Sequence, residues 1–600
     1  MVEAALSGEE RTLVAQVSPE KLMESTSAIA RWVRLSGTPE EAAAFDWIQA
    51  RLEEYGLQTA RYSFPSLVSW PESASLEVTG ADGRVHAIPC ATHGFAASTP
   101  DEGFEAELVY AGKGSEAEIR QSGAAGKIAL IDGIIAQNHN LVAERAGVAA
   151  SVWIAGGRLH ERILSPVWGT PTPETASLLP KTPSVSVLGS EGVRLKEILA
   201  SGPARARLRT RVFRGWKEIP VLTGDLRPAA DGPESDTFVM LSGHVDSWYY
   251  GAMDNGSANA AQLEVARLLA ERRGELRRGL RVAFWSGHSH GRYSGSAWYA
   301  DNCWQELHDS CVAHVNVDSL GARGATVLSE GNSMEEVRSF ASEVIELIAG
   351  QRLEKRRYGR SGDQSFWGHG FPAMLMSLSE QPPEGADPAL LALHHQIGGG
   401  QSAGGGLGWW WHTPDDTLDK IDPDFLKRDA QIYALIVYRL CARPVLPFDY
   451  RASVAEMKED LAAIATRAGD ALDLSPAGRQ LEALGAAVEK LYSYMAWSAT
   501  GEEAVVANRC LMKLGRALIP VNYSRTGPFD QDLAVPTKPF PGLQAAVDLP
   551  SLPVGSDEYH FLRTRLVRER NRILHGLIEA TRSAEETVRV FEDWGKGGSQ

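Results

Sequence analysis

The distribution of apolar and polar residues divides the 600-residue chain into regions of different periodicity. Residues 18–57 show apolar positions at helical spacing, and this pattern is broken at 36–39, where Thr38 and Pro39 are suited to begin a second helix. Residues 71–215 instead carry short apolar stretches between glycines, which predict a β-rich insert domain. Its clearest elements are predicted strands at 126–133, 150–154 and 183–187 and a helix at 138–146.

The region 216–447 alternates apolar strands with amphipathic helices. We expect strands at 237–241, 279–286, 311–317 and 372–377, and helices at 256–273, 295–306, 333–350 and 423–442. This alternation predicts an α/β fold with a mostly parallel sheet covered by helices, to which residues 1–70 contribute. Four further helices predict a separate helical domain over 448–600, at 456–467, 476–493, 501–518 and 558–589.

A glycine-rich segment at 398–408 interrupts the α/β pattern. Its glycines favour neither helix nor strand, so we expect a mobile loop. Because it has no Gly-Lys-Ser/Thr sequence, it is not expected to cradle phosphate groups.

Charge and cysteine content narrow the class of protein. The 60 basic and 76 acidic residues give a net charge of −16, which offers no support for nucleic-acid binding. The five cysteines are sparse and lack metal-site spacing, so free thiols in a reducing compartment are expected. No apolar run is long enough to span a membrane, and no N-terminal leader is visible. These features predict a cytoplasmic protein.

Histidines and aspartates follow several of the predicted strands. Parallel strands bring such residues to one edge of the sheet, where imidazole and carboxylate groups together suit zinc or a related transition ion. Asp246 is placed to accept the second ring N–H of His244. The candidate ligands are His244 and Asp254 after the first strand, His288 and His290 after the second, Asp318 after the third, and His412.

At these residues the chain resembles the co-catalytic zinc aminopeptidase superfamily, in particular its glutamate carboxypeptidase II and transferrin receptor branch. The segment Gly243–Asp254 carries the most specific likeness, and the order of a protease-associated insert, a catalytic sheet and a C-terminal helical domain agrees with it. The resemblance implies that His244 and Asp318 bind one metal, that His412 binds a second, and that Asp254 bridges them. It also implies a homodimer formed through the C-terminal domain.

One segment departs from this family. Where the family has two adjacent glutamates, a general base followed by a metal ligand, this chain has His288-Ser-His290. The alignment leaves two registers open. We predict that His290 is the ligand and His288 the replacement base, because residues at i and i+2 of an extended segment face the same side.

Three functions are compatible with these residues. The first is a hydrolase that cleaves an amide-like C–N bond of a small molecule or short peptide, using one or two zinc ions. The alternatives are a metal-dependent lyase or cyclase on the same scaffold, and a non-catalytic dimer similar to the transferrin receptor. The candidate substrate contacts are Tyr250, Asp363 and Trp411, and Arg292, Arg323 and Arg360 are candidates for binding an acidic group.

Overall fold

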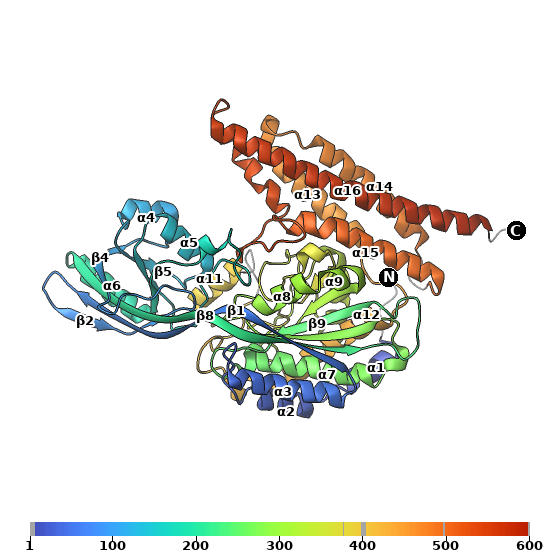
Figure 1. Ribbon diagram of the computed structural model, residues 1–600, viewed down its shortest axis with the longest axis horizontal. Helices are drawn as coiled ribbons and strands as arrows, with labels where there is room; N and C mark the ends of the chain where they lie inside the picture. The colour runs from blue at the N-terminus through green and yellow to red at the C-terminus, as the bar shows by residue number, and fades with distance from the viewer. Residues whose placement is uncertain (1–5, 330, 376, 398–403, 496–498, 598–600) are drawn as a thin grey trace.

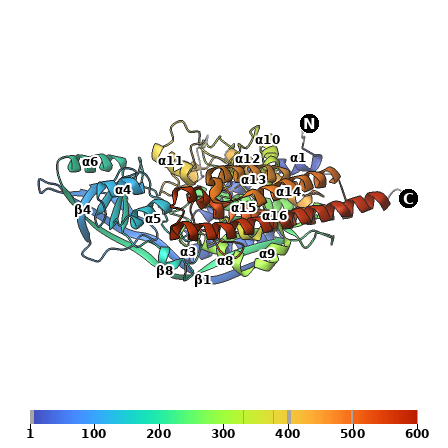
Figure 2. The ribbon, with the colours of Figure 1, turned by 90° about the horizontal axis from the view of Figure 1, so that it is seen from above.

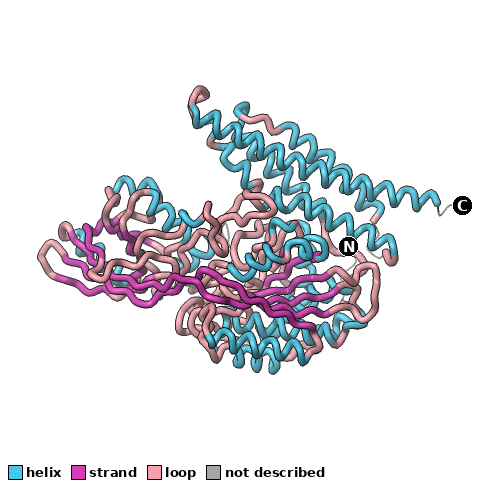
Figure 3. Tube along the Cα trace, in the orientation of Figure 1, coloured by secondary structure: helices cyan, strands magenta, loops and turns pink. Residues whose placement is uncertain are grey.

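A sheet of 12 strands runs through the chain. The computed structural model describes residues 6–329, 331–375, 377–397, 404–495 and 499–597. Two long antiparallel strands, β1 (Gln58–Thr79) and β8 (Ala204–Leu226), extend along most of the length of the sheet (Figure 3). Short strands were expected here. Positions 70 and 215, the predicted limits of the insert, lie inside β1 and β8, so the division into domains remains a prediction.

The main half of the sheet carries four parallel strands. These are β9 (Phe238–His244), β10 (Gly279–Trp285), β11 (Cys311–Asn316) and β12 (Ala373–Met374). Helices α2 (Pro19–Ile29), α3 (Pro39–Glu54) and α7 (Ala258–Ala270) cover one face, and α8 (Ser294–Asn302) and α9 (Trp304–Ser310) cover the other (Figure 1). The predicted mostly parallel sheet with helices on both faces is confirmed.

Local sequence signals account for the starts of two helices that cover the sheet. The side chains of Ser18 and Thr38 cap α2 and α3, each followed by a proline at the first helical position. Helices α10 (Glu335–Ala349) and α12 (Pro423–Ala442) form where expected. The single helix predicted at 295–306 is instead the pair α8 and α9, which meet at Cys303, and α1 (Gly8–Ala15) was not predicted.

The insert region builds the other half of the sheet. Its strands are β2 (Val85–Ile88), β3 (Cys90–Thr92), β4 (Phe104–Tyr110), β5 (Ile128–Asp132), β6 (Ala150–Ile154) and β7 (Ser184–Val187). Its helices are α4 (Glu116–Ser122), α5 (Gln137–Arg145) and α6 (Gly189–Ala200). Strands β4 to β7 are parallel, and β5, β6, β7 and α5 lie where the sequence predicted them. Figure 2 shows this region at one end of the molecule.

The C-terminal region is helical, as predicted. Its long helices are α13 (Tyr450–Ala468), α14 (Ser475–Tyr494), α15 (Glu502–Tyr523) and α16 (Asp557–Gly597), and α16 packs along α14 and α15 (Figure 1). Among the described residues, no helix is long and apolar enough to cross a membrane. All five cysteines are unpaired. The glycine-rich loop is neither helix nor strand at 404–408, and 398–403 lie outside the described residues.

Candidate active site

Two of the predicted metal ligands, His244 and His412, lie on either side of the carboxylate of a third, Asp254. His244 ends β9, Asp254 lies in the turn before α7, and His412 lies in a loop before α12. The Nε2 atom of His244 is 3.0 Å from Asp254 Oδ1, and the Nε2 atom of His412 is 3.0 Å from Asp254 Oδ2. Asp318 Oδ1 lies 3.7 Å from His244 Nε2. Asp254 therefore lies between the two imidazoles, as a bridging ligand would.

The hydrogen bonds of these histidines fix which ring nitrogen faces the site. His244 Nδ1 lies 2.8 Å from the carbonyl oxygen of Asp246, and His412 Nδ1 lies 2.8 Å from that of Glu161. A carbonyl only accepts, so each Nδ1 carries a proton and each neutral ring turns the lone pair of Nε2 toward Asp254. A lone pair that faces a carboxylate at this distance requires a proton or a cation between them. His244 Nε2 and Asp254 Oδ1 have no hydrogen-bond partner among the described residues, so the site fits a transition metal ion.

The same proximity controls the charges of these side chains. Although burial favours the neutral ring, the carboxylates of Asp246, Asp254 and Asp318 hold the pKa of His244 well above its usual value. Burial would raise the pKa of Asp254, but the imidazoles of His244 and His412, each 3.0 Å from one of its oxygens, hold it well below its usual value. Asp254 is therefore a carboxylate, the form that binds metal.

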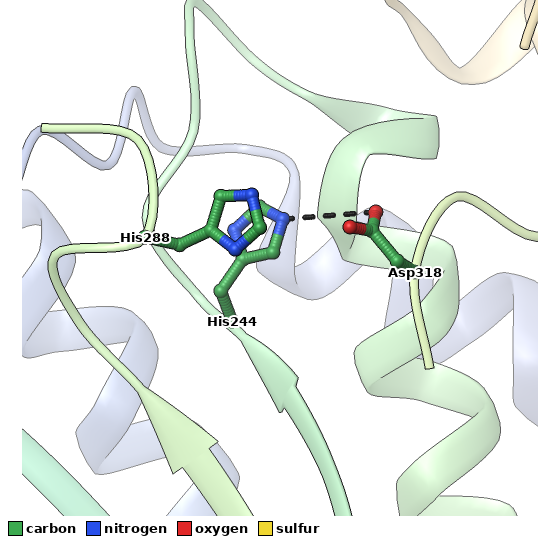
Figure 4. A group of neighbouring side chains, drawn as sticks. All are labelled: His244, His288 and Asp318. Atoms are coloured by element: carbon green, nitrogen blue, oxygen red, sulfur yellow. Dashed lines mark ion pairs between the residues drawn. The ribbon is translucent and has the colours of Figure 1, made fainter. Parts of the chain in front are cut away.

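His288 joins this group. Ligand atoms of His244, His288 and Asp318 all lie within 4.8 Å of one another. Figure 4 shows the rings of His244 and His288 lying over each other, with centroids 3.7 Å apart, and the carboxylate of Asp318 beside them. His288 Nδ1 lies 2.9 Å from Asp363 Oδ2. His288 thus contributes an imidazole in the segment where the family has its glutamates.

His290 does not face the same side as His288. Strand β10 ends at Trp285, and Gly287 adopts a positive φ of 76°, so the extended geometry assumed for this segment is wrong. The Nδ1 atom of His290 instead lies 3.1 Å from Ser36 Oγ and 3.2 Å from Asp246 Oδ2. The ligand role predicted for His290 remains untested, but the geometry places His288 nearer to the other ligands.

The carboxylate of Asp246 accepts hydrogen bonds from the loop that contains His288, and not from the ring of His244. Its carboxylate accepts the backbone N–H groups of His288 and Ser289, at 3.0 and 2.8 Å, and lies 3.7 Å from His244 Nδ1. The sequence prediction that this carboxylate accepts the ring N–H of His244 is corrected, because the backbone carbonyl of Asp246 does so. Asp246 is fully buried and therefore cannot contact a substrate.

A second aspartate, Asp416, fixes the position of Asp254. The backbone N–H groups of Met253 and Asp254 donate to Asp416 Oδ1 and Oδ2, at 2.9 and 3.0 Å. Asp416 is 2% exposed. This role of Asp416 could not be predicted from the sequence, because its partner segment lies some 160 residues earlier in the chain and only the fold brings the two together.

A cavity of about 130 Å³ opens onto the ligands. Its wall includes Asp254, His288, Asp318 and His412, together with residues of the insert region and of the loop near Ala534. The cavity is small beside the roughly 300–1,000 Å³ of typical drug-sized sites. It therefore suits a small substrate group.

Buried arginines line the same cavity. Arg162, Arg292 and Arg360 are only 4%, 7% and 4% exposed, and within the described parts of the chain none has a carboxylate within 4.0 Å. Burial lowers the pKa of Arg162 to about 9 and that of Arg360 to about 10. Buried charges are normally paired, so three such cations beside one cavity favour an anionic occupant.

Only some of the predicted substrate-binding residues line the cavity. Trp411 lines the cavity and stacks on His412 at 3.7 Å between centroids. Tyr250 is 48% exposed and does not line the cavity, and the Asp363 carboxylate is occupied by His288 and by Ser296. Arg292 and Arg360 line it, whereas Arg323 pairs with Asp422 elsewhere. Arg162 was missed, because only the fold brings the insert region to the site.

The fold and the side chains together define a zinc-peptidase-like domain. More particularly, residues 224–437 match the model of Peptidase family M28. A probable glutamate carboxypeptidase VP8 from Zea mays is 26% identical over 543 residues, which cover 77% of this chain and 72% of that protein. Human carboxypeptidase Q is 24% identical over 357 residues, which cover 56% of this chain and 71% of the relative.

Solved structures confirm the fold class. An aminopeptidase from Aneurinibacillus sp. strain AM-1 superposes with a TM-score of 0.54 at 21% identity, covering 72% of this chain and 96% of that one. A peptidase M28 precursor from Shewanella amazonensis gives 0.56 at 17% identity, covering 73% and 97%. These structural likenesses show the fold alone, and the sequence matches make the chain a distant homologue of carboxypeptidases.

Proposed function

We propose that this protein is a metal-dependent hydrolase that cleaves an amide C–N bond close to a carboxylate group in a small molecule or short peptide. Zinc is the expected ion, because the ligand set combines imidazole with carboxylate. The names of the similar carboxypeptidases support a substrate with a free carboxylate.

One observation carries this proposal: three buried arginines without a carboxylate partner line the same small cavity as the metal-binding side chains. A guanidinium group binds carboxylate through two parallel hydrogen bonds, which favours a substrate with an acidic group near the bond to be cleaved. The net charge of −16 makes this local positive charge the more distinctive.

Different residues of the site would bind the metal ion and the substrate. His244, Asp254, Asp318 and His412 would hold the metal. A bound divalent cation would polarise the scissile carbonyl and make a water molecule more acidic. Arg162, Arg292 and Arg360 would bind and orient the substrate carboxylate, and the side chain of Trp411 would help to exclude bulk water.

A second candidate is a metal-dependent cyclase or lyase that acts on the same kind of anionic substrate. It is favoured by the replacement of the family's two glutamates, since His288-Ser-His290 offers no carboxylate base. Asp246, which contacts this segment, already uses both of its oxygens on backbone N–H groups.

A substrate screen tests the proposal. The zinc-loaded protein is incubated with acidic dipeptides, N-acyl amino acids and their carboxamide analogues, and products are identified by mass spectrometry. We expect cleavage of acidic compounds with uptake of one water, loss of cleavage with a chelator, and little cleavage of the carboxamides. A product of unchanged mass or one formed without water uptake supports the cyclase or lyase. A screen without any turnover, from protein with full metal content, contradicts both.

A further inference from the structure

Two histidines of the candidate metal site, His244 and His412, share one orientation. In His244 and His412, Nδ1 faces a backbone carbonyl at 2.8 Å and Nε2 faces Asp254 at 3.0 Å. His288 shares part of this arrangement: its Nδ1 atom also faces an oxygen atom, its ring lies against that of His244, and one of its ring nitrogens lies within 4.8 Å of ligand atoms of His244 and Asp318. Its acceptor differs, since it is the carboxylate of Asp363 rather than a carbonyl.

We propose that His288 is a metal ligand through Nε2 and that Asp363 is the positioning residue that holds it there. This inference deepens the proposed function and rests on it, because it concerns the same metal site. An acceptor carboxylate fixes the tautomer with the proton on Nδ1 and makes Nε2 a stronger donor to a metal ion. It also returns one negative charge near a site where an imidazole has replaced a carboxylate ligand.

Asp363 is itself held firmly. It is 1% exposed, and its Oδ1 accepts a hydrogen bond of 2.8 Å from Ser296 Oγ on α8. Ser296 Oγ also lies 2.8 Å from Ser365 Oγ, which accepts a hydrogen bond of 2.8 Å from Trp168 Nε1. Both carboxylate oxygens of Asp363 are therefore occupied, and this residue is not available to a substrate.

His290 offers a matched contrast two positions away. It is fully buried, its Nδ1 lies 3.1 Å from Ser36 Oγ and 3.2 Å from Asp246 Oδ2, and it is not part of the group formed by His244, His288 and Asp318. The two histidines thus belong to the same loop but have different surroundings. His288 thus takes the ligand role that the sequence pattern suggested for His290, and His290 becomes a packing residue of the loop.

Metal binding by four variants tests this inference. His288→Ala, Asp363→Asn, His290→Ala and Asp532→Asn are titrated with zinc against a coloured chelator, and the cobalt(II)-loaded proteins are compared by visible absorption. Asp532→Asn is the matched control, since Asp532 is also a buried aspartate but its carboxylate accepts hydrogen bonds from Arg525 and Thr526 rather than from a histidine. Thermal unfolding of the metal-free proteins identifies any variant that fails to fold.

We expect Asp363→Asn to bind zinc about 10- to 100-fold more weakly than the wild type, the usual effect of losing an outer hydrogen-bond partner of a ligand. His288→Ala should weaken binding at least as much, and both should change the cobalt spectrum. His290→Ala and Asp532→Asn should bind within about threefold of the wild type. Wild-type affinity and spectrum in Asp363→Asn, or a greater loss in His290→Ala than in His288→Ala, would overturn the inference alone. A wild-type protein that binds no metal would overturn the proposed function as well.

Discussion

Asp416 offers a sharp test of how the site is preorganised, because its neighbour provides the control. Each of its two carboxylate oxygens accepts one buried backbone N–H, from Met253 and from Asp254. Asp416→Asn replaces one oxygen with an amide group that cannot accept. One buried N–H is then left unpaired, which costs about 1–3 kcal/mol.

The unpaired N–H group lies in the segment that positions the Asp254 carboxylate for metal binding. If this loss of free energy destabilises the metal-binding conformation, zinc binding weakens by about 10- to 100-fold, since about 1.4 kcal/mol corresponds to a tenfold change in affinity. Burial, with a smaller contribution from Asp254, raises the pKa of Asp416 to about 7. The titration is therefore done at a pH above this value, where the wild-type residue is ionised.

Asp415→Asn is the matched control. Its side chain is half exposed and pairs at 3.3 Å with Arg158, which is also exposed, so its loss should leave zinc affinity unchanged. Competition titration of both variants against one chelator measures the difference. Equal zinc affinities in the two variants would refute the conclusion that Asp416 positions Asp254.

Three further predictions concern other parts of the molecule. Arg162→Met should raise KM for an acidic substrate by about 10- to 100-fold, which corresponds to the loss of one charge-assisted hydrogen bond. Arg158→Met changes an exposed arginine of the same loop and should leave KM unchanged. Equal effects of the two substitutions would argue against carboxylate recognition by Arg162. Burial raises the pKa of Glu336 to about 7, so its contribution to stability is present below about pH 4.5 and lost as the pH rises through about 7. Glu336→Gln should therefore raise the free energy of unfolding at pH 8 by up to about 3 kcal/mol, seen as a higher melting temperature, but not at pH 4.5. A gain that is independent of pH would contradict this reasoning. Phe561 on α16 is 72% exposed, and light scattering should give a dimer that Phe561→Asp weakens; a wild-type monomer would exclude the predicted homodimer.

The candidate ligands could be predicted from the sequence because their positions follow from a local rule. His244 and Asp318 stand directly at or after strands whose apolar runs are plain, and parallel strands bring their carboxyl ends to one edge. Which of His288 and His290 lies near the other ligands could not be predicted in the same way. It depends on where β10 ends and on the turn at Gly287, neither of which the apolar pattern determines.

The arginines and the long strands illustrate two other limits. Arg162 reaches the cavity only because β1 and β8 join the insert region to the main half of the sheet, so its role depends on contacts distant in sequence. The alternation of exposed arginines with buried residues from Ala204 to Leu208 does predict an extended strand. It does not show that the same strand continues to Leu226 and pairs with β1 throughout.

The most direct test of the account is a comparison of one acidic dipeptide with its carboxamide analogue, using protein with a measured metal content. We expect the zinc-loaded protein to hydrolyse the acidic compound, chelation to abolish this activity and added zinc to restore it, and the carboxamide to be cleaved far more slowly. Equal rates for the two compounds, or hydrolysis that persists in protein shown to be free of metal, would contradict it.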